Sequence, residues 1–65
     1  MNRIRIILAE QNRTNKWLAE KIGITATTVS RWAQNKNQPT LNKLVEVAKL
    51  LNVDVKDLLE PTLER

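Results

Sequence analysis

One segment constrains the fold of this chain more than any other: residues 14 to 39, TNKWLAEKIGITATTVSRWAQNKNQP. It predicts two short helices, because Thr14 and Thr25 are suited to cap helix N-termini and Gly23 follows the first helix. Glycine readily adopts the left-handed backbone conformation that lets a chain turn sharply. A polar loop without acidic residues follows the second helix. This layout presents the second helix to the major groove of DNA, which favours a binding protein over an enzyme.

Apolar residues at helical spacing predict three further helices and no strands. The first runs from about Asn2 to Gln11, and the last is a short C-terminal helix at about 54–60. The fourth helix begins after Thr40 and has Val47 at the edge of its apolar stripe. That stripe is the strongest in the chain and comprises Leu41, Leu44, Val45, Ala48 and Leu51.

These elements predict a single all-α domain over residues 1–65, with the two-helix unit at about 14–34. The absence of cysteine fits a reducing compartment. The charged N-terminus does not resemble a signal peptide, and no apolar run approaches the roughly 20 residues that span a bilayer. We therefore expect a cytoplasmic protein.

The charge of the chain is unevenly distributed. Residues 1 to 43 hold eight basic and two acidic side chains, whereas residues 44 to 65 hold three basic and five acidic ones. The first part therefore carries +6 and the second −2. Such asymmetry indicates one end that faces a polyanion, although a simply soluble surface explains it equally well.

The residue types exclude most catalytic chemistry. There is no histidine or cysteine, no Gly-rich phosphate loop, and no pair of carboxylates outside solvated helix faces. We expect neither an enzyme nor a protein with a metal or other cofactor.

Nearly the whole chain, about residues 4 to 60, resembles the lambda repressor-like, Cro/C1-type (XRE) helix-turn-helix domains of bacteria and phages. Single matches are weak, but their joint spacing is specific to this family. The matching residues are Thr14, Leu18-Ala19, Gly23-Ile24, Thr25, Val29-Ser30, Trp32, Pro39, Leu44, Ala48-Lys49-Leu50-Leu51 and Val53. The resemblance implies a five-helix fold with helix-turn-helix at the second and third helices, and a bacterial or phage-encoded regulator.

Three positions depart from the family pattern. Asn35 stands where glycine is common, but asparagine tolerates the left-handed conformation. Leu8 and Ala33 replace a buried Arg–Glu ion pair together, so no unpaired buried charge remains, and such replacements are often neutral or stabilising by roughly 1–4 kcal/mol. Trp17 replaces a residue that is usually polar; we expect it to cover the core beside the first helix or the C-terminal helix.

The resemblance assigns three residues to base-facing positions of the third helix: Ala26, Thr27 and Arg31. Arg31 is the strongest candidate, because its guanidinium can donate two hydrogen bonds to guanine, which discriminates by about 1–3 kcal/mol. The predicted phosphate contacts flank the groove and comprise Asn15, Thr25, Thr28, Lys36, Asn37 and Gln38. For each of these groups the alternative is an ordinary solvated surface.

Family members commonly bind palindromic operators as dimers, so the expected partners are double-stranded DNA and a second copy of the chain. The candidate dimer patch is Leu58, Leu59 and Leu63; alternatively, Val55, Leu58 and Leu59 only complete the core of the monomer. A different function, an antitoxin-like or other protein-binding module with secondary DNA binding, is less favoured. The chain shows no additional arm for neutralising a toxin, and no small-molecule effector site is evident.

Overall fold

A computed structural model of the protein describes residues 1 to 61. It contains four α-helices: α1 (Ile4–Glu10), α2 (Asn15–Ile22), α3 (Ala26–Ala33) and α4 (Leu41–Leu51). A 3-10 helix, η1 (Val55–Leu58), stands where a fifth α-helix was predicted. The five-helix prediction was therefore wrong in one element, because Leu59 already has an extended backbone and ends η1 after a single turn.

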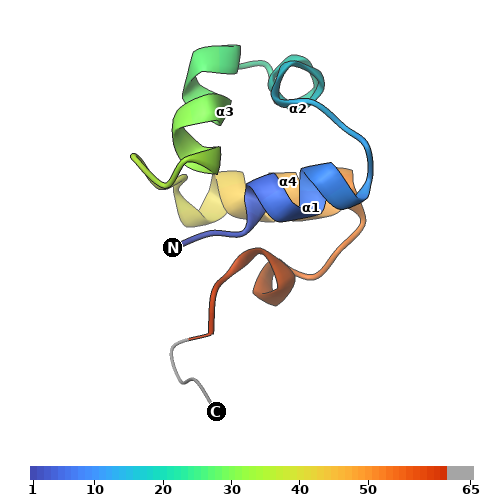
Figure 1. The fold of residues 1–65 in the computed structure, drawn as a ribbon, viewed down its shortest axis with the longest axis vertical. Coiled ribbons are helices and arrows are strands. Elements are labelled where there is room, and N and C mark those ends of the chain that lie inside the picture. Colours follow the sequence, from blue (N-terminus) through green and yellow to red (C-terminus); the bar gives the residue numbers. More distant parts are fainter. Residues whose placement is uncertain (62–65) are drawn as a thin grey trace.

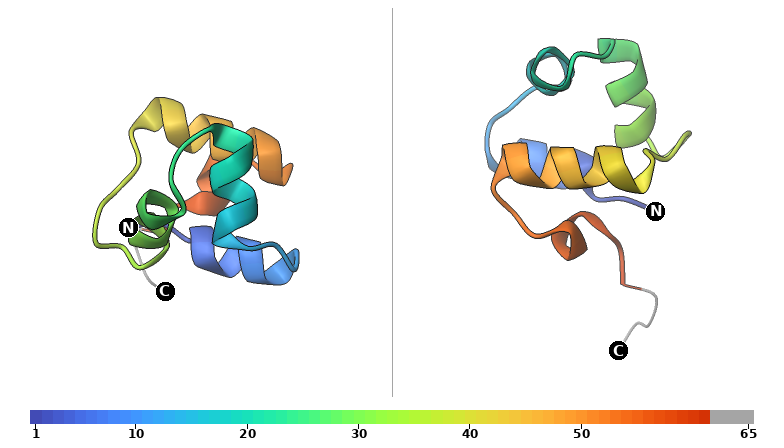
Figure 2. Two further views of the ribbon diagram at one scale, coloured as in Figure 1. Left: turned by 90° about the horizontal axis from the view of Figure 1, so that it is seen from above. Right: turned by 180° about the vertical axis from the view of Figure 1, so that it is seen from behind.

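The helices lie in three tiers (Figures 1 and 2). Helices α2 and α3 form one end of the molecule, and η1 closes the other end. Helices α1 and α4 cross the middle at the same height, but the view from above shows them apart from each other. The described residues contain no regular strand, but an isolated antiparallel bridge joins Asn2 to Leu59. None of the helices in residues 1–61 is long and apolar enough to cross a bilayer.

The helix starts follow the predicted capping chemistry. Side-chain hydroxyls of Thr14, Thr25 and Thr40 accept hydrogen bonds from backbone N–H groups three residues later, at 3.0, 3.2 and 3.2 Å. Each of these bonds satisfies an N–H group that has no partner within its own helix. The predicted boundaries of α2, α3 and α4 therefore agree with the structure to within a residue at their starts.

The turns at Gly23 and Asn35 have the predicted geometry, and two further asparagines adopt the same conformation. Gly23 has φ +86° and ends α2, while Asn12, Asn35 and Asn52 have φ of 55°, 58° and 57°. These are the left-handed conformations that glycine, and among other residues mainly asparagine, adopt at low cost. Asn35 therefore replaces the common glycine without loss of the turn.

One core fills the space between the tiers. Its fully enclosed side chains come from every helix, and the largest are Ile4, Leu18, Val29, Val47, Leu51 and Leu58. Leu8 and Ala33 are also buried, and no buried side-chain polar atom of the described residues lacks a partner. The two positions that hold an ion pair in the family pattern therefore lie in an apolar interior.

The predicted stripe of α4 was wrong at three positions. Leu41 is 70% exposed and Val45 is only half-buried, whereas Val47 is completely buried and not at the edge of the stripe. The apolar face that packs on the core is Leu44, Val47, Ala48 and Leu51, with the spacing of three and four residues typical of one helix face. Leu41, in the first turn, lies outside that face.

Candidate nucleic-acid interface

Helix α3 has one buried face and one exposed face. Val29, Trp32 and Ala33 are buried and point into the core. The three predicted base-facing residues, Ala26, Thr27 and Arg31, are all exposed on the other side. Helix α2 packs closely on α3, and α1 also contacts it, so this exposed face is held by a rigid scaffold.

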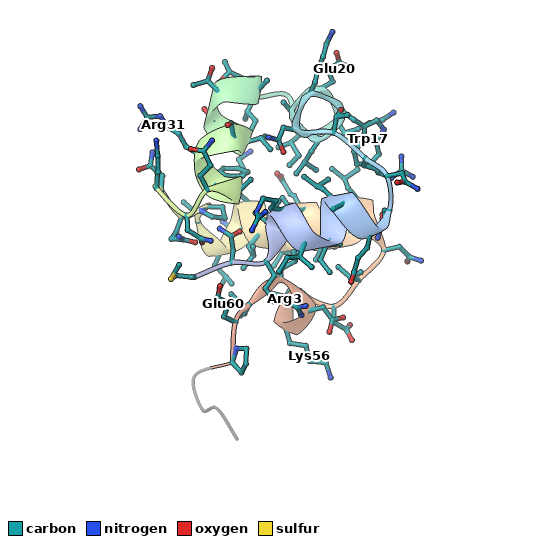
Figure 3. All side chains as sticks on the ribbon, viewed as in Figure 1. Arg3, Trp17, Glu20, Arg31, Lys56 and Glu60 are labelled. Carbon is teal, nitrogen blue, oxygen red and sulfur yellow. The ribbon has the colours of Figure 1, made fainter. Side chains whose placement is uncertain are left out.

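Arg31 is available to a ligand. Its side chain lies at the edge of the molecule on the α3 side, away from η1 (Figure 3). Within residues 1–61 the recorded ion pair joins Lys43 to Glu46, and no described carboxylate pairs with Arg31. An unpaired guanidinium on a helix that is otherwise packed is suited to donate to an acceptor supplied from outside.

Two threonines mark the start of α3. The Thr25 hydroxyl accepts from the Thr28 backbone N–H, and the two hydroxyl oxygens lie 2.9 Å apart in a hydrogen bond. Thr25 is exposed and Thr28 is half-buried. Their hydroxyls are already ordered by one another, so a phosphate contact here would be made by a preorganised pair.

Asn15 is the first residue of α2 and is half-buried. Lys16 beside it is exposed, and the backbone N–H groups of this first turn carry the partial positive charge of a helix start. The prediction of a phosphate contact here is therefore compatible with the position of Asn15.

The loop after α3 contains the remaining predicted phosphate contacts. Lys36 and Asn37 are exposed, and their backbone N–H groups both donate to the Arg31 carbonyl, at 2.9 and 3.4 Å. Gln38 is also exposed, but its side-chain amide bonds to Asn2 and Asn35. Gln38 therefore has less hydrogen-bonding capacity left for a phosphate than the sequence indicates.

Trp17, a residue of α2, is partly buried and packs against the core. It lies on the side of α2 that faces away from α3 (Figure 3). The guanidinium of Arg13 stacks on its ring, with the central carbon 4.0 Å from the ring centroid. This cation–π contact was not predicted, since nothing in a single sequence marks which arginine will meet which ring. The structure places Trp17 in the predicted role of a partial cover for the core.

The candidate dimer patch is not assembled as predicted. Leu58 is completely buried in the core of the monomer, because η1 turns it toward α4, so it is not exposed to a second copy. Leu59 is 45% exposed. Leu63 lies outside the described residues.

Sequence reasoning missed the role of Asn2, the one buried polar residue among residues 1–61. Its side chain and backbone bond to Ile4, Trp32, Asn35 and Gln38. An asparagine at the start of a predicted helix is an N-capping signal. That local signal could have indicated the bond to Ile4, but not the bonds to residues 30 or more positions away.

Comparison with known proteins agrees with this geometry. The model of the Cro/C1-type HTH DNA-binding domain matches residues 3–64. The crystal structure of a protein from Bacteroides fragilis, described as a "putative DNA-binding protein", superposes with a TM-score of 0.88 at 57% identity, covering 89% of this chain and 94% of that one. A comparison with curated proteins gave no significant match. Because the family model covers almost the entire sequence, the chain belongs to the Cro/C1-type helix-turn-helix DNA-binding domains.

Proposed function

We propose that this protein is a transcriptional regulator that binds double-stranded DNA in a sequence-specific manner, with α3 in the major groove. The observation that carries the proposal is the exposed face of α3, on a helix packed against the rest of the fold. Thr27 and Arg31 lie on this face, and no carboxylate among residues 1–61 pairs with Arg31. Thr27 and Ala26 offer a hydroxyl and small apolar groups to base edges, and Arg31 offers a bidentate donor.

Phosphate contacts flank this face in the proposed complex. Asn15 and Lys16 at the start of α2 lie on one side, and Lys36 and Asn37 in the loop after α3 lie on the other. These contacts fix the register of the helix in the groove and supply affinity that falls as salt rises. Sequence preference comes from the α3 side chains alone.

The proposed complex contains two copies of the chain on a palindromic operator. Among the described residues of the candidate patch, Leu59 is exposed and available for such a contact. Pro61, two residues later, is also exposed. A twofold arrangement would place two α3 helices about one helical turn of DNA apart.

The test is selection of binding sites from random duplex DNA, followed by affinity measurements with three variants. Arg31→Ala is expected to weaken the preference for the selected base at one base pair of the site. The free-energy difference between the right and the wrong base there should fall by about 1–3 kcal/mol. Lys36→Ala is expected to weaken selected and unselected duplexes equally and to lower the magnitude of the salt slope by about 0.9.

Lys56→Ala provides the matched control, because Lys56 is an exposed lysine in η1, at the end of the molecule opposite Arg31 (Figure 3). It is expected to change neither preference nor affinity beyond the small effect of net charge. Identical behaviour of Arg31→Ala and Lys36→Ala would contradict the proposed docking of α3. Failure of the selection to enrich any motif would contradict sequence-specific binding.

A further inference from the structure

We propose that Asn2 is a positioning residue for DNA binding: it holds the loop after α3 in place and thereby presents Lys36 and Asn37 to the phosphate backbone. This inference rests on the proposed function, because it concerns contacts of the same interface. Asn2 itself is 4% exposed and reaches no ligand, so it acts through the residues that it holds.

The side-chain amide of Asn2 is fully used. Its Oδ1 accepts from the Ile4 backbone N–H at 3.0 Å, and its Nδ2 donates to the Trp32 carbonyl and to Gln38 Oε1, both at 2.9 Å. Trp32 lies in the last turn of α3, and its carbonyl also accepts from the Asn35 backbone N–H at 3.0 Å. Asn2 therefore supports the start of α1 and the end of α3 simultaneously.

The backbone of Asn2 makes a second connection to the same loop. Its N–H donates to Asn35 Oδ1 at 2.8 Å, and its carbonyl accepts from Asn35 Nδ2 at 3.3 Å. Gln38 Nε2 also donates to Asn35 Oδ1, at 3.0 Å. Residues 35 and 38 are thus bonded to each other and to Asn2.

These hydrogen bonds fix residues 35 and 38, which lie at the two ends of the segment 36–37. Lys36 and Asn37 are the two residues between these fixed positions, and both are exposed. A lysine side chain normally loses considerable rotamer freedom when it is ordered on a partner. Fixing the backbone beneath Lys36 lowers the additional ordering cost of a phosphate contact, which is the usual gain from preorganisation.

Backbone hydrogen bonds also hold the residues on either side of Asn2, Met1 and Arg3, to the segment 58–60. The Arg3 N–H donates to the Leu58 carbonyl at 2.8 Å, and the Glu60 N–H donates to the Met1 carbonyl at 3.1 Å. Asn2 is therefore held between the segment around Leu58 and the loop after α3. This anchoring gives Asn2 a fixed position from which it can orient the loop.

The experiment compares Asn2→Ala with Gln11→Ala. Gln11 provides the matched control, because its Nε2 donates to the Leu51 carbonyl at 2.7 Å and so also makes a long-range bond from a side chain to a helix end. That bond joins the ends of α1 and α4, at a distance from the loop after α3. Both variants lose stability, but only Asn2→Ala is expected to change DNA binding.

The probe is a mixed-sequence duplex, titrated at several salt concentrations with protein shown to be folded by circular dichroism. Asn2→Ala is expected to bind about 3- to 10-fold more weakly, as for a weakened charge-assisted contact. The magnitude of its salt slope is expected to fall by up to about 0.9. Lys36→Ala should then cost less in the Asn2→Ala background than in the unmodified protein, because the two changes affect one contact.

Asn35→Gly is the second variant, in case Asn2→Ala does not fold. Glycine keeps the left-handed turn at φ 58° but removes both side-chain bonds to Asn2. Folded Asn35→Gly is expected to show the same weaker binding and lower salt slope.

Amide hydrogen exchange separates failure of this inference from failure of the proposed function. Without DNA, the Lys36 and Asn37 amides are expected to exchange faster in Asn2→Ala than in Gln11→Ala. If the unmodified protein binds no duplex, the proposed function fails and exchange alone decides whether Asn2 holds the loop. If folded Asn2→Ala or Asn35→Gly binds with unchanged affinity and salt slope, the positioning role of Asn2 is overturned.

Discussion

The burial of Leu58 allows a direct test of the fold, because Leu58 is the one completely buried residue of the short 3-10 helix η1. Leu58 has no exposed surface, whereas its neighbour Leu59 is 45% exposed. The two residues have the same side chain and adjacent positions. Leu58→Ala and Leu59→Ala therefore make the same chemical change, once at a buried and once at an exposed position, and the difference between their losses of stability reports the effect of burial.

The expected loss for Leu58→Ala is about 2–5 kcal/mol, from the lost burial and the cavity that remains. A domain of 65 residues has a total unfolding free energy of roughly 3–10 kcal/mol. Since 1 kcal/mol shifts the melting temperature of a domain this small by about 4–8 °C, the midpoint should fall by at least about 10 °C. Leu59→Ala should cost less than about 1 kcal/mol.

The assay is urea and thermal unfolding followed by circular dichroism. Equal losses for the two variants, or a loss below about 1 kcal/mol for Leu58→Ala, would show that η1 is not an integral part of the core. Sedimentation of the folded Leu59→Asp variant separately tests the proposed dimer contact, which predicts a weaker association.

Substitutions at three further positions test local features, each by urea unfolding. Gly23→Ala places a Cβ in open space, so only the strain of φ +86° remains, and we expect a loss of about 1–2 kcal/mol; unchanged stability would mean that the turn relaxes. Thr40→Ala removes the cap of α4 and should cost about 1 kcal/mol, while Thr40→Ser should recover most of it, and equal losses would exclude the hydroxyl as the cause. Lys43→Ala breaks the ion pair with Glu46, whose side chains are 40% and 52% exposed, and should change stability by no more than about 0.5 kcal/mol; a larger loss would show an additional role for Lys43 in packing.

Features determined by neighbouring residues were predictable from the sequence. The three threonine caps act over three residues, and the left-handed turns at Gly23 and Asn35 depend on the residue itself. The positions on the exposed face of α3 were those that the family resemblance assigns to the bases. These signals are sufficient to place the helices and to orient the candidate DNA-binding face.

Features determined by distant contacts were not predictable. The bonds of Asn2 to Trp32 and Gln38 cross 30 and 36 positions, and no local pattern identifies such partners. The exposure of Leu41 depends on where the core ends, and the burial of Leu58 on how η1 folds back on α4. The candidate site was therefore predicted as a set of exposed residues, whereas the interactions that hold it in place required the structure.

The most direct test of the central claim is a nuclear magnetic resonance titration of the isotope-labelled protein with the selected duplex. If α3 enters the major groove, the largest amide shift changes should fall on residues 26–31 and 36–38 and on the start of α2. The exposed face of α4 around Lys49 should remain nearly unchanged. Large changes confined to α4, with α3 unaffected, would contradict the account.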